Sequence, residues 1–258
     1  ALAKQGYDVA LVARTLVNGE AHDHIGNTNP LPGSLEATAA IVKLTGQQAL
    51  CLRGDILDEN SMIAAVEKTI DHFGQIDFLF NNAVYQGKGN QEPMIEITKE
   101  QMQAVYQGNI FTPLAIIKAA LPSMEKRKKG TIINMLSATA FLDPPTTAAK
   151  GGWGFLYPSS KAAFGRMAGA LRVEHPDAGL RFLNLEPGTV ITELMKASGI
   201  DKEILKHFRP CTPAAIASVV AWLADNEAKD EWKPLGVMRG PAIAKALGLL
   251  KVVSLLEH

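Results

Sequence analysis

Short apolar runs alternate with longer segments of helical periodicity along most of the chain. Each apolar run is short enough for a single strand, and a nearly continuous apolar run such as residues 76–80 is expected of a strand that is covered on both faces. The predicted strands cover residues 8–13, 48–52, 76–80, 131–136 and 181–185. The predicted helices cover residues 35–44, 59–72, 98–124, 157–174 and 212–225.

Residues typical of helix ends support these boundaries. Ser34 is expected to cap the first helix, Asp55 or Asp58 the second, and Thr98 with Gln101 has the spacing of a capping box. The helix over residues 98–124 is expected to be interrupted near Pro113 and Pro122. Beyond residue 225 no closing strand is recognisable, and residues 242–250 are predicted to be an apolar helix. The chain is thus an α/β protein of one domain, residues 1–255, followed by Leu-Glu-His, which resembles a tag remnant.

Composition narrows the function. Lys and Arg together number 26, as do Asp and Glu, so the charge balance favours neither nucleic acid nor a membrane surface as partner. Cys51 and Cys211 lack the spacing of a zinc site or disulfide scaffold, and no signal peptide or spanning apolar run is evident, which predicts a cytoplasmic protein. His22 and His24 are expected to be solvated loop residues, and no metal site is predicted.

Tyr157 and Lys161 are the most distinctive polar pair in the sequence. At a spacing of four residues they project from one side of a helix, so the ammonium can stabilise a phenolate and lower the pKa of Tyr157. Such a pair can act as a general acid and base if a substrate is presented to it. Because Tyr-x-x-x-Lys is common on helix surfaces, the surrounding motifs must decide its meaning.

Those motifs occur in a characteristic order. Asn81-Asn82-Ala83 ends a strand, Asn109 lies in the long helix, Ser137 ends the next strand, and Glu186-Pro187-Gly188 follows Lys161. This set resembles the short-chain dehydrogenase/reductase family over roughly residues 1–225. The resemblance implies a doubly wound, Rossmann-like sheet, hydride transfer between a nicotinamide and a carbonyl or alcohol, and assembly into homodimers or homotetramers.

The resemblance also assigns roles. Tyr157 would transfer the proton, Ser137 would orient the substrate oxygen, Lys161 would hold Tyr157 and the ribose, and Asn109 would hold a water that links Lys161 to solvent. Arg14 at a strand tip, where an acidic residue would favour NAD, favours NADP, although it could be a solvated charge. The expected cofactor residues are Arg14, Thr15, Asp55, Ile56, Asn82, Ala83, Tyr157, Lys161, Pro187, Gly188, Val190 and Thr192.

Three departures from the family pattern shape further expectations. No first strand or glycine-rich turn precedes residue 8, so we expect that the native start is missing and that the second and fourth strands of the family order flank a gap; the alternative is a rearranged sheet. Val84 replaces the family's usual glycine. Ser137 and Tyr157 are 20 residues apart, a longer separation than is usual, and residues 142–153 are expected to form a lid or wall near the substrate.

Two questions stay open at this level. Residues 193–209 are expected to form a mobile substrate flap, or else a plain amphipathic surface helix. The sequence does not identify the substrate. A catalytically silent nucleotide-binding or interaction module on the same fold is the alternative to an enzyme, and the four expected catalytic groups argue against it.

Overall fold

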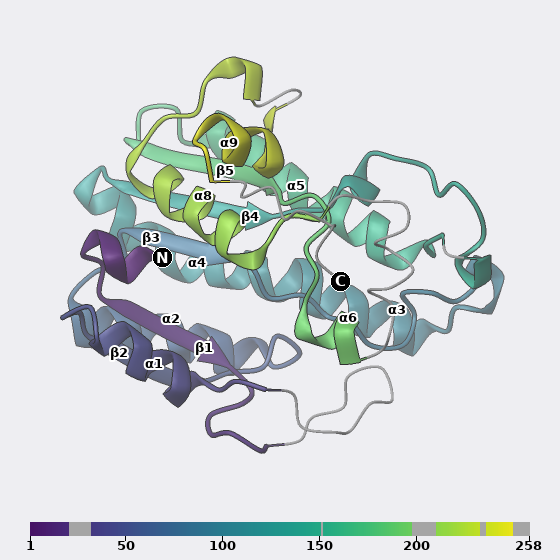
Figure 1. The fold of residues 1–258 in the computed structure, drawn as a ribbon, viewed down its shortest axis with the longest axis horizontal. Coiled ribbons are helices and arrows are strands. Elements are labelled where there is room, and N and C mark those ends of the chain that lie inside the picture. The colour runs from purple at the N-terminus through teal and green to yellow at the C-terminus, as the bar shows by residue number, and fades with distance from the viewer. Residues whose placement is uncertain (21–31, 151, 198–209, 233–235, 250–258) are drawn as a thin grey trace, which may run out of the picture.

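All paired strands of the protein are parallel, and they form two separate sheets (Figure 1). The computed structural model describes residues 1–20, 32–150, 152–197, 210–232 and 236–249. One sheet pairs β1 (Val9–Ala13) with β2 (Ala49–Arg53). The other has the order β3 (Phe78–Asn81), β4 (Gly130–Met135), β5 (Leu180–Glu186) and β6 (Val237–Arg239).

Helices connect successive strands, as the alternating pattern predicted. The residues expected at helix starts are in place: Ser34 accepts from the amide of Ala37, and Thr98 and Gln101 form a complete capping box. The helices are α1 (Leu35–Lys43), α2 (Glu59–Phe73), α3 (Lys99–Tyr106), α4 (Thr112–Arg127), α5 (Leu156–Glu174), α6 (Glu193–Ala197), α8 (Pro213–Asp225) and α9 (Gly240–Ala246). Short 3₁₀ turns are η1 (Leu2–Gln5), η2 (Met94–Glu96), η4 (Ala138–Ala140), η5 (Ala148–Lys150) and η6 (Asp230–Trp232), and η3 (Gln107–Phe111) is a π-helix.

Both faces of the larger sheet are covered. On one face, Ile133 and Leu185 pack with Val219 of α8 and Ile243 of α9. On the other face, side chains such as Ile132 pack with residues of α2, α4 and α5. Successive residues of β4 therefore enter opposite cores, which explains why this strand is apolar without alternation. Among the described residues, no helix is both long and apolar enough to span a membrane.

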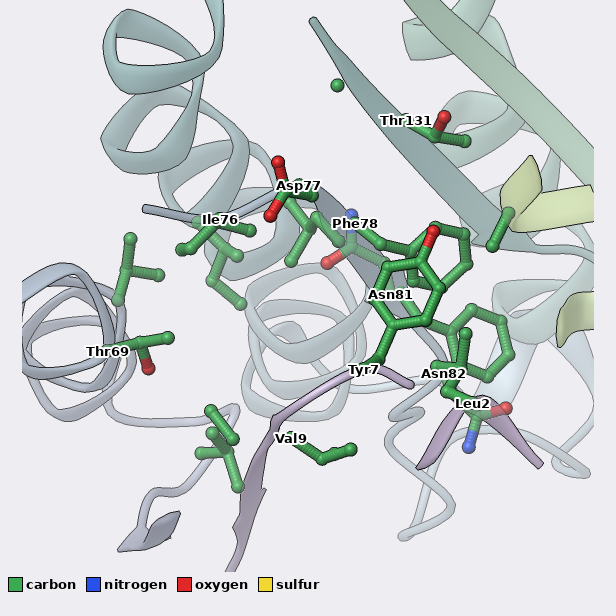
Figure 2. A pocket seen from close by; sticks show the side chains of 18 of the residues that line it. Leu2, Tyr7, Val9, Thr69, Ile76, Asp77, Phe78, Asn81, Asn82 and Thr131 are labelled. Carbon is green, nitrogen blue, oxygen red and sulfur yellow. The ribbon is translucent and has the colours of Figure 1, made fainter. Parts of the chain in front are cut away.

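A cavity of about 1530 Å³ separates β1 from β3 (Figure 2). Its lining includes most of β1 and β3 together with residues of η1, α2, α4 and the end of α8. The order β2-β1 followed by β3-β4-β5-β6 is the expected one, with a gap where the first strand of the family order was predicted to be absent. The described strands show the expected order on each side of this gap rather than a rearranged sheet.

Three expectations about helices and strands were wrong. The strand β6 was not predicted, because three residues carry almost no sequence signal and Val237 and Met238 become a strand by pairing with β5. Pro122 does not interrupt α4, which packs firmly through Ala120 and Met124, both fully buried. The interruption expected near Pro113 is present, as the π-helix η3, which ends one residue before α4 begins with Pro113 in its first turn. The last helix, α9, begins at Gly240 rather than at residue 242 and ends earlier.

Candidate active site

The four predicted catalytic residues come from adjoining elements. Ser137 follows the buried strand β4, Tyr157 and Lys161 lie in the first turns of α5, and Asn109 lies in η3. Helix α5 contacts β4, η3 and η4, so these segments are neighbours in space. Only the tertiary structure brings them together, since Asn109 and Lys161 are far apart in the sequence.

Burial controls the chemistry of Tyr157. It raises the pKa of the phenol above its usual value near 10, and a hydrogen bond with the Ser137 hydroxyl lowers it in part. The net direction is upward, so the predicted lowering of this pKa by Lys161 is wrong for the protein without bound molecules. Desolvation outweighs the favourable contacts, and at neutral pH Tyr157 is a protonated phenol that can donate.

Ser137 is oriented by its own turn. Its Oγ accepts from the backbone amide of Thr139 at 3.3 Å and lies 3.0 Å from the Thr139 hydroxyl, which donates to it. The hydroxyl of Ser137 thus retains its proton for another acceptor while its oxygen is held in place. Thr139 was not predicted as a site residue, and its only sequence signal is its position two residues after Ser137.

Lys161 is almost fully buried, with 3% of its surface exposed. Its Nζ donates to the backbone carbonyl of Met135 at 2.8 Å and lies 5.1 Å from the centre of the Phe164 ring. Burial lowers the pKa of the ammonium from 10.5 to about 8. A buried cation with so few hydrogen bonds has donor capacity left for a further acceptor, which a ribose hydroxyl could fill.

Asn109 is held in place by hydrogen bonds from both ends of its side-chain amide. Its side chain, 2% exposed, accepts from the backbone amide of Tyr85 at 2.8 Å and donates to Ser160 Oγ at 3.0 Å. Ser160 Oγ in turn donates to the carbonyl of Tyr157 at 2.8 Å. This path links Asn109 to the backbone at Tyr157, and Ser160 is a positioning residue that the sequence did not single out. A π-helix at this point is common at functional sites.

The predicted cofactor residues follow the carboxyl ends of the strands. Arg14 and Thr15 follow β1, Asp55 and Ile56 follow β2, Asn82 and Ala83 follow β3, and Pro187 and Gly188 follow β5. In open α/β sheets, ligands bind in the crevice outside these ends. The positions predicted from separate motifs therefore belong to one edge of the structure, interrupted by the cavity beside β1.

Several of these residues also have structural tasks. Asp55 Oδ1 accepts from the amide of Leu57 at 2.9 Å, while Thr192 Oγ1 accepts from Met195 at the start of α6. The turn at Gly188 has φ of 70°, and a Cβ there would lie 2.6 Å from a carbon of Pro241. Only glycine fits this turn, which sets the path of the chain toward Val190.

Arg53 is a candidate cofactor residue that the sequence analysis missed. It ends β2 directly beside Ala13 at the end of β1, and its guanidinium donates to the carbonyl of Arg14 at 2.8 Å. It also pairs with Glu20 at 2.6 Å. The signal that could have found it is symmetry, since an arginine stands at the tip of each of two adjacent strands.

The described residues fit a nicotinamide dinucleotide. Arginines at the tips of β1 and β2 suit the negative charge of phosphate, the carboxylate of Asp55 suits adenine or ribose donors, and buried Lys161 suits ribose hydroxyls. When bound, such a cofactor supplies or accepts the hydride. Val84, in place of the family's glycine, is partly exposed and is followed by Tyr85, whose amide is fixed by Asn109.

The long connection between Ser137 and Tyr157 lines a second cavity, of about 920 Å³. Its apolar wall includes the side chains of Phe141, Leu142, Trp153 and Phe155, consistent with the wall expected from this segment. Within the described part of the chain, Trp153 Nε1 is buried and has no hydrogen-bond partner. Of the predicted flap, the structure describes α6, whereas residues 198–209 lie outside the described residues, as do His22 and His24.

Most of the chain is similar in sequence to one known family. The family model of the short chain dehydrogenase matches residues 1–203. The oxidoreductase YhdF of Bacillus subtilis, whose function is uncharacterized, is 30% identical over 198 residues, covering 74% of this chain and 65% of YhdF. The class is that of a doubly wound, dinucleotide-binding protein with a serine, tyrosine and lysine constellation. The chain belongs to the short-chain dehydrogenase/reductase family, whose members are NAD(P)-dependent oxidoreductases.

Solved structures of similar fold have been found with either nicotinamide cofactor. A metagenomic short-chain oxidoreductase in complex with NADP has a TM-score of 0.63 at 22% identity, covering 88% of this chain and 84% of that one. The NADH-dependent reductase A1-R′ complexed with NAD has a TM-score of 0.58 at 21% identity, covering 72% and 70%. At these identities the similarity concerns the fold, so the cofactor preference of this chain has to come from its own residues.

Proposed function

We propose that this protein is an NADP(H)-dependent oxidoreductase that interconverts a carbonyl and an alcohol, with Tyr157 as general acid and base. The single observation that carries the proposal is the interaction of the Ser137 side chain with Tyr157, which lowers the pKa of the phenol in part, together with the buried cation Lys161 one turn further along α5. A serine hydroxyl and a protonated phenol that converge in this way can both donate to one substrate oxygen. Burial of a lysine is costly, and a buried ammonium at this position can stabilise a phenolate at Tyr157.

In the reductive direction, Ser137 donates a hydrogen bond to the carbonyl oxygen of the substrate and polarises it. As hydride reaches the carbon, Tyr157 gives its proton to the oxygen, and the phenolate that forms is stabilised by the ammonium of Lys161. The raised pKa of Tyr157 keeps the phenol protonated at neutral pH, so that the proton is present for this transfer. Oxidation of the alcohol is the reverse, with the phenolate as base, and its rate should therefore rise with pH.

NADP preference is supported by Arg14 and Arg53. Two arginines at adjacent strand tips can supply donors for a ribose 2′-phosphate, and the guanidinium of Arg53 is bound to the backbone carbonyl of Arg14. Arg53 also pairs with Glu20, so its guanidinium would have to bind both the Glu20 carboxylate and the phosphate. An NAD-preferring enzyme is the lesser alternative.

The test is turnover of NADPH with a panel of ketones and aldehydes, followed by absorbance of the reduced cofactor. Tyr157→Phe should lower kcat by about 10²- to 10⁴-fold while NADPH binding, measured by its fluorescence, is unchanged. Tyr106→Phe is the matched control, because its hydroxyl lies 3.1 Å from Ser159 on a different side of α5. NADPH binding without turnover in the unaltered protein would favour the silent binding module, and turnover that survives Tyr157→Phe would remove the mechanism.

A further inference from the structure

The cavity of about 920 Å³ beside the long connection adjoins the proposed catalytic residues. Thr139 and Pro158 both line it. The hydroxyl of Thr139 donates to Ser137 Oγ at 3.0 Å. Pro158 directly follows Tyr157 in the first turn of α5. A molecule in this cavity would therefore lie next to the two groups proposed to bind the substrate oxygen.

Apolar side chains from three segments line this cavity. They include Met94 before α3, Phe141, Leu142 and Phe155 of the long connection, and Ala162 of α5. Phe141, Leu142 and Phe155 remain 53%, 58% and 42% exposed, so much of their apolar surface is still in contact with solvent. Covering such surface favours binding, and cavities of this size hold ligands with several rings.

The charge of the cavity is acidic. Among the described residues that line it, Glu92 and Asp143 are the ionisable ones, and there is no lysine, arginine or histidine. The carboxylate of Glu92 already accepts from the amides of Gly89 at 2.8 Å and Gln91 at 3.0 Å. A bound anion would therefore lose water and meet like charge without a compensating cation. The cavity suits an uncharged ligand.

The indole of Trp153 gives this wall an unused donor. Its Nε1 is buried and has no hydrogen-bond partner among the described residues. An indole N–H can only donate, and leaving it unpaired when buried is costly. The next residue, Gly154, packs closely on the segment before α3, because a Cβ there would lie 2.7 Å from the carbonyl oxygen of Asn90. The backbone beside the indole is thus held in place.

We propose that this cavity binds the apolar body of an uncharged carbonyl substrate, and that Trp153 Nε1 donates a hydrogen bond to a second acceptor of that substrate. The reacting carbonyl is taken to lie at Ser137 and Tyr157, so this inference rests on the proposed function. The substrate class is a neutral ketone or aldehyde with a ring-sized apolar group and an ether, hydroxyl or carbonyl oxygen away from the reacting carbon. Trp153 determines specificity and takes no part in the chemistry.

Three ketones that differ at one position test this assignment. They are 2-acetylnaphthalene, its 6-methoxy derivative and its 6-carboxylate. Calorimetric titration into the protein with NADP, which cannot reduce a ketone, measures their affinity without turnover. The methoxy ketone should bind about three- to tenfold more tightly than the unsubstituted one, the gain expected from one hydrogen bond. The carboxylate should bind at least about a hundredfold more weakly, because its charge would be desolvated without a partner.

Trp153→Phe keeps an aromatic ring in the wall and removes the donor. It should abolish the preference for the methoxy over the unsubstituted ketone. Trp232→Phe is the matched control, because that indole packs against Trp222 outside the cavity, with 6.1 Å between the ring centres, and the preference should remain. In turnover with NADPH, the preference lost in Trp153→Phe should appear in KM rather than in kcat, since the donor is away from the reacting carbon.

A preference for the methoxy ketone that survives Trp153→Phe would overturn the inference, and so would a carboxylate that binds as tightly as the neutral ketones. Turnover of butanone without binding of the naphthyl ketones would also overturn it and leave the proposed function standing. Binding in the expected order, with no turnover by NADPH, would support the neutral binding site at Trp153 and contradict the proposed function alone.

Discussion

The strand β1 is apolar throughout and β4 includes Thr131 and Asn134, yet β4 is the more deeply buried of the two. Residues 130–134 of β4 are all buried, whereas every residue of β1 remains at least partly exposed. The difference lies in the neighbours, because among the described strands β4 pairs with β3 and β5 while β1 pairs with β2 alone. An apolar run thus specifies a strand that can be buried. Whether the strand is buried depends on the strands and helices that pack against it.

The residues of the candidate site are also divided between the well-packed sheet of β3 to β6 and the less buried sheet of β1 and β2. Ser137, Tyr157, Lys161 and Asn109 stand on the well-packed sheet and its helices, whereas Arg14 and Asp55 follow the sheet that borders the cavity. Stability varies within a structure according to local packing. The groups proposed for proton transfer should therefore be held more rigidly than those proposed for the adenosine end of the cofactor.

The largest expected contrast is in core truncations. Ile133→Ala removes a side chain that is fully buried and should cost about 3–5 kcal/mol of unfolding free energy. Leu11→Ala, in β1, should cost roughly 1 kcal/mol, since its surroundings are incomplete. Denaturant unfolding measures both. Equal losses would contradict the division into a complete and an incomplete half.

A second contrast concerns lysines in the two halves. The pKa of Lys161 is lowered to about 8, so between pH 8 and 10 the unfolded chain binds more protons there than the folded chain, and stability should rise with pH across that window. Below pH 8 the full cost of the buried charge, about 3 kcal/mol, is present. Lys161→Met should remove this rise and leave the protein at least as stable at pH 7.

Lys43→Met on α1 is the control, because that side chain is exposed. Unfolding curves between pH 7 and 10 for the three proteins provide the measurement. If the stability of Lys161→Met still rises between pH 8 and 10, another titrating group causes the rise.

Cofactor binding provides the third contrast. Arg14→Ala should weaken NADPH binding by about tenfold, the loss of one charge-assisted hydrogen bond, and change NADH binding little. Arg166→Ala, an exposed position on α5, should change neither. Fluorescence titration of each variant with NADPH and with NADH measures these changes in affinity. Equal weakening of both would assign Arg14 to a role other than recognition of the 2′-phosphate.

The smallest contrast is in helix capping. Ser34→Ala and Asp58→Ala each remove a side-chain acceptor for a first-turn amide and should cost about 1 kcal/mol. Among the described elements, α1 packs mainly on β1 and β2. The loss of the Ser34 cap should therefore appear mainly as faster amide exchange in α1. The second should lower global stability, because α2 also packs on α4.

Local rules were reliable wherever a residue acts on its own neighbours in the chain. Ser34 and Thr98 cap the helices that their sequence contexts indicated, and of the two candidates for α2 it is Asp58 that caps the helix. The Tyr157 to Lys161 spacing placed both residues in one helix, α5. Short-range signals failed at β6, whose three residues become a strand only because β5 offers them hydrogen bonds.

The sequence by itself determined the order of strands and helices, the family, and the identity of the groups that meet at the candidate site, because periodicity, capping and motif spacing are local properties. Only the tertiary structure decided that Lys161 is buried against Met135, that desolvation raises the pKa of Tyr157, that Ser160 joins it to Asn109, and that a cavity parts β1 from β3. Burial and electrostatic environment depend on segments distant in the chain, and no single stretch of sequence specifies them.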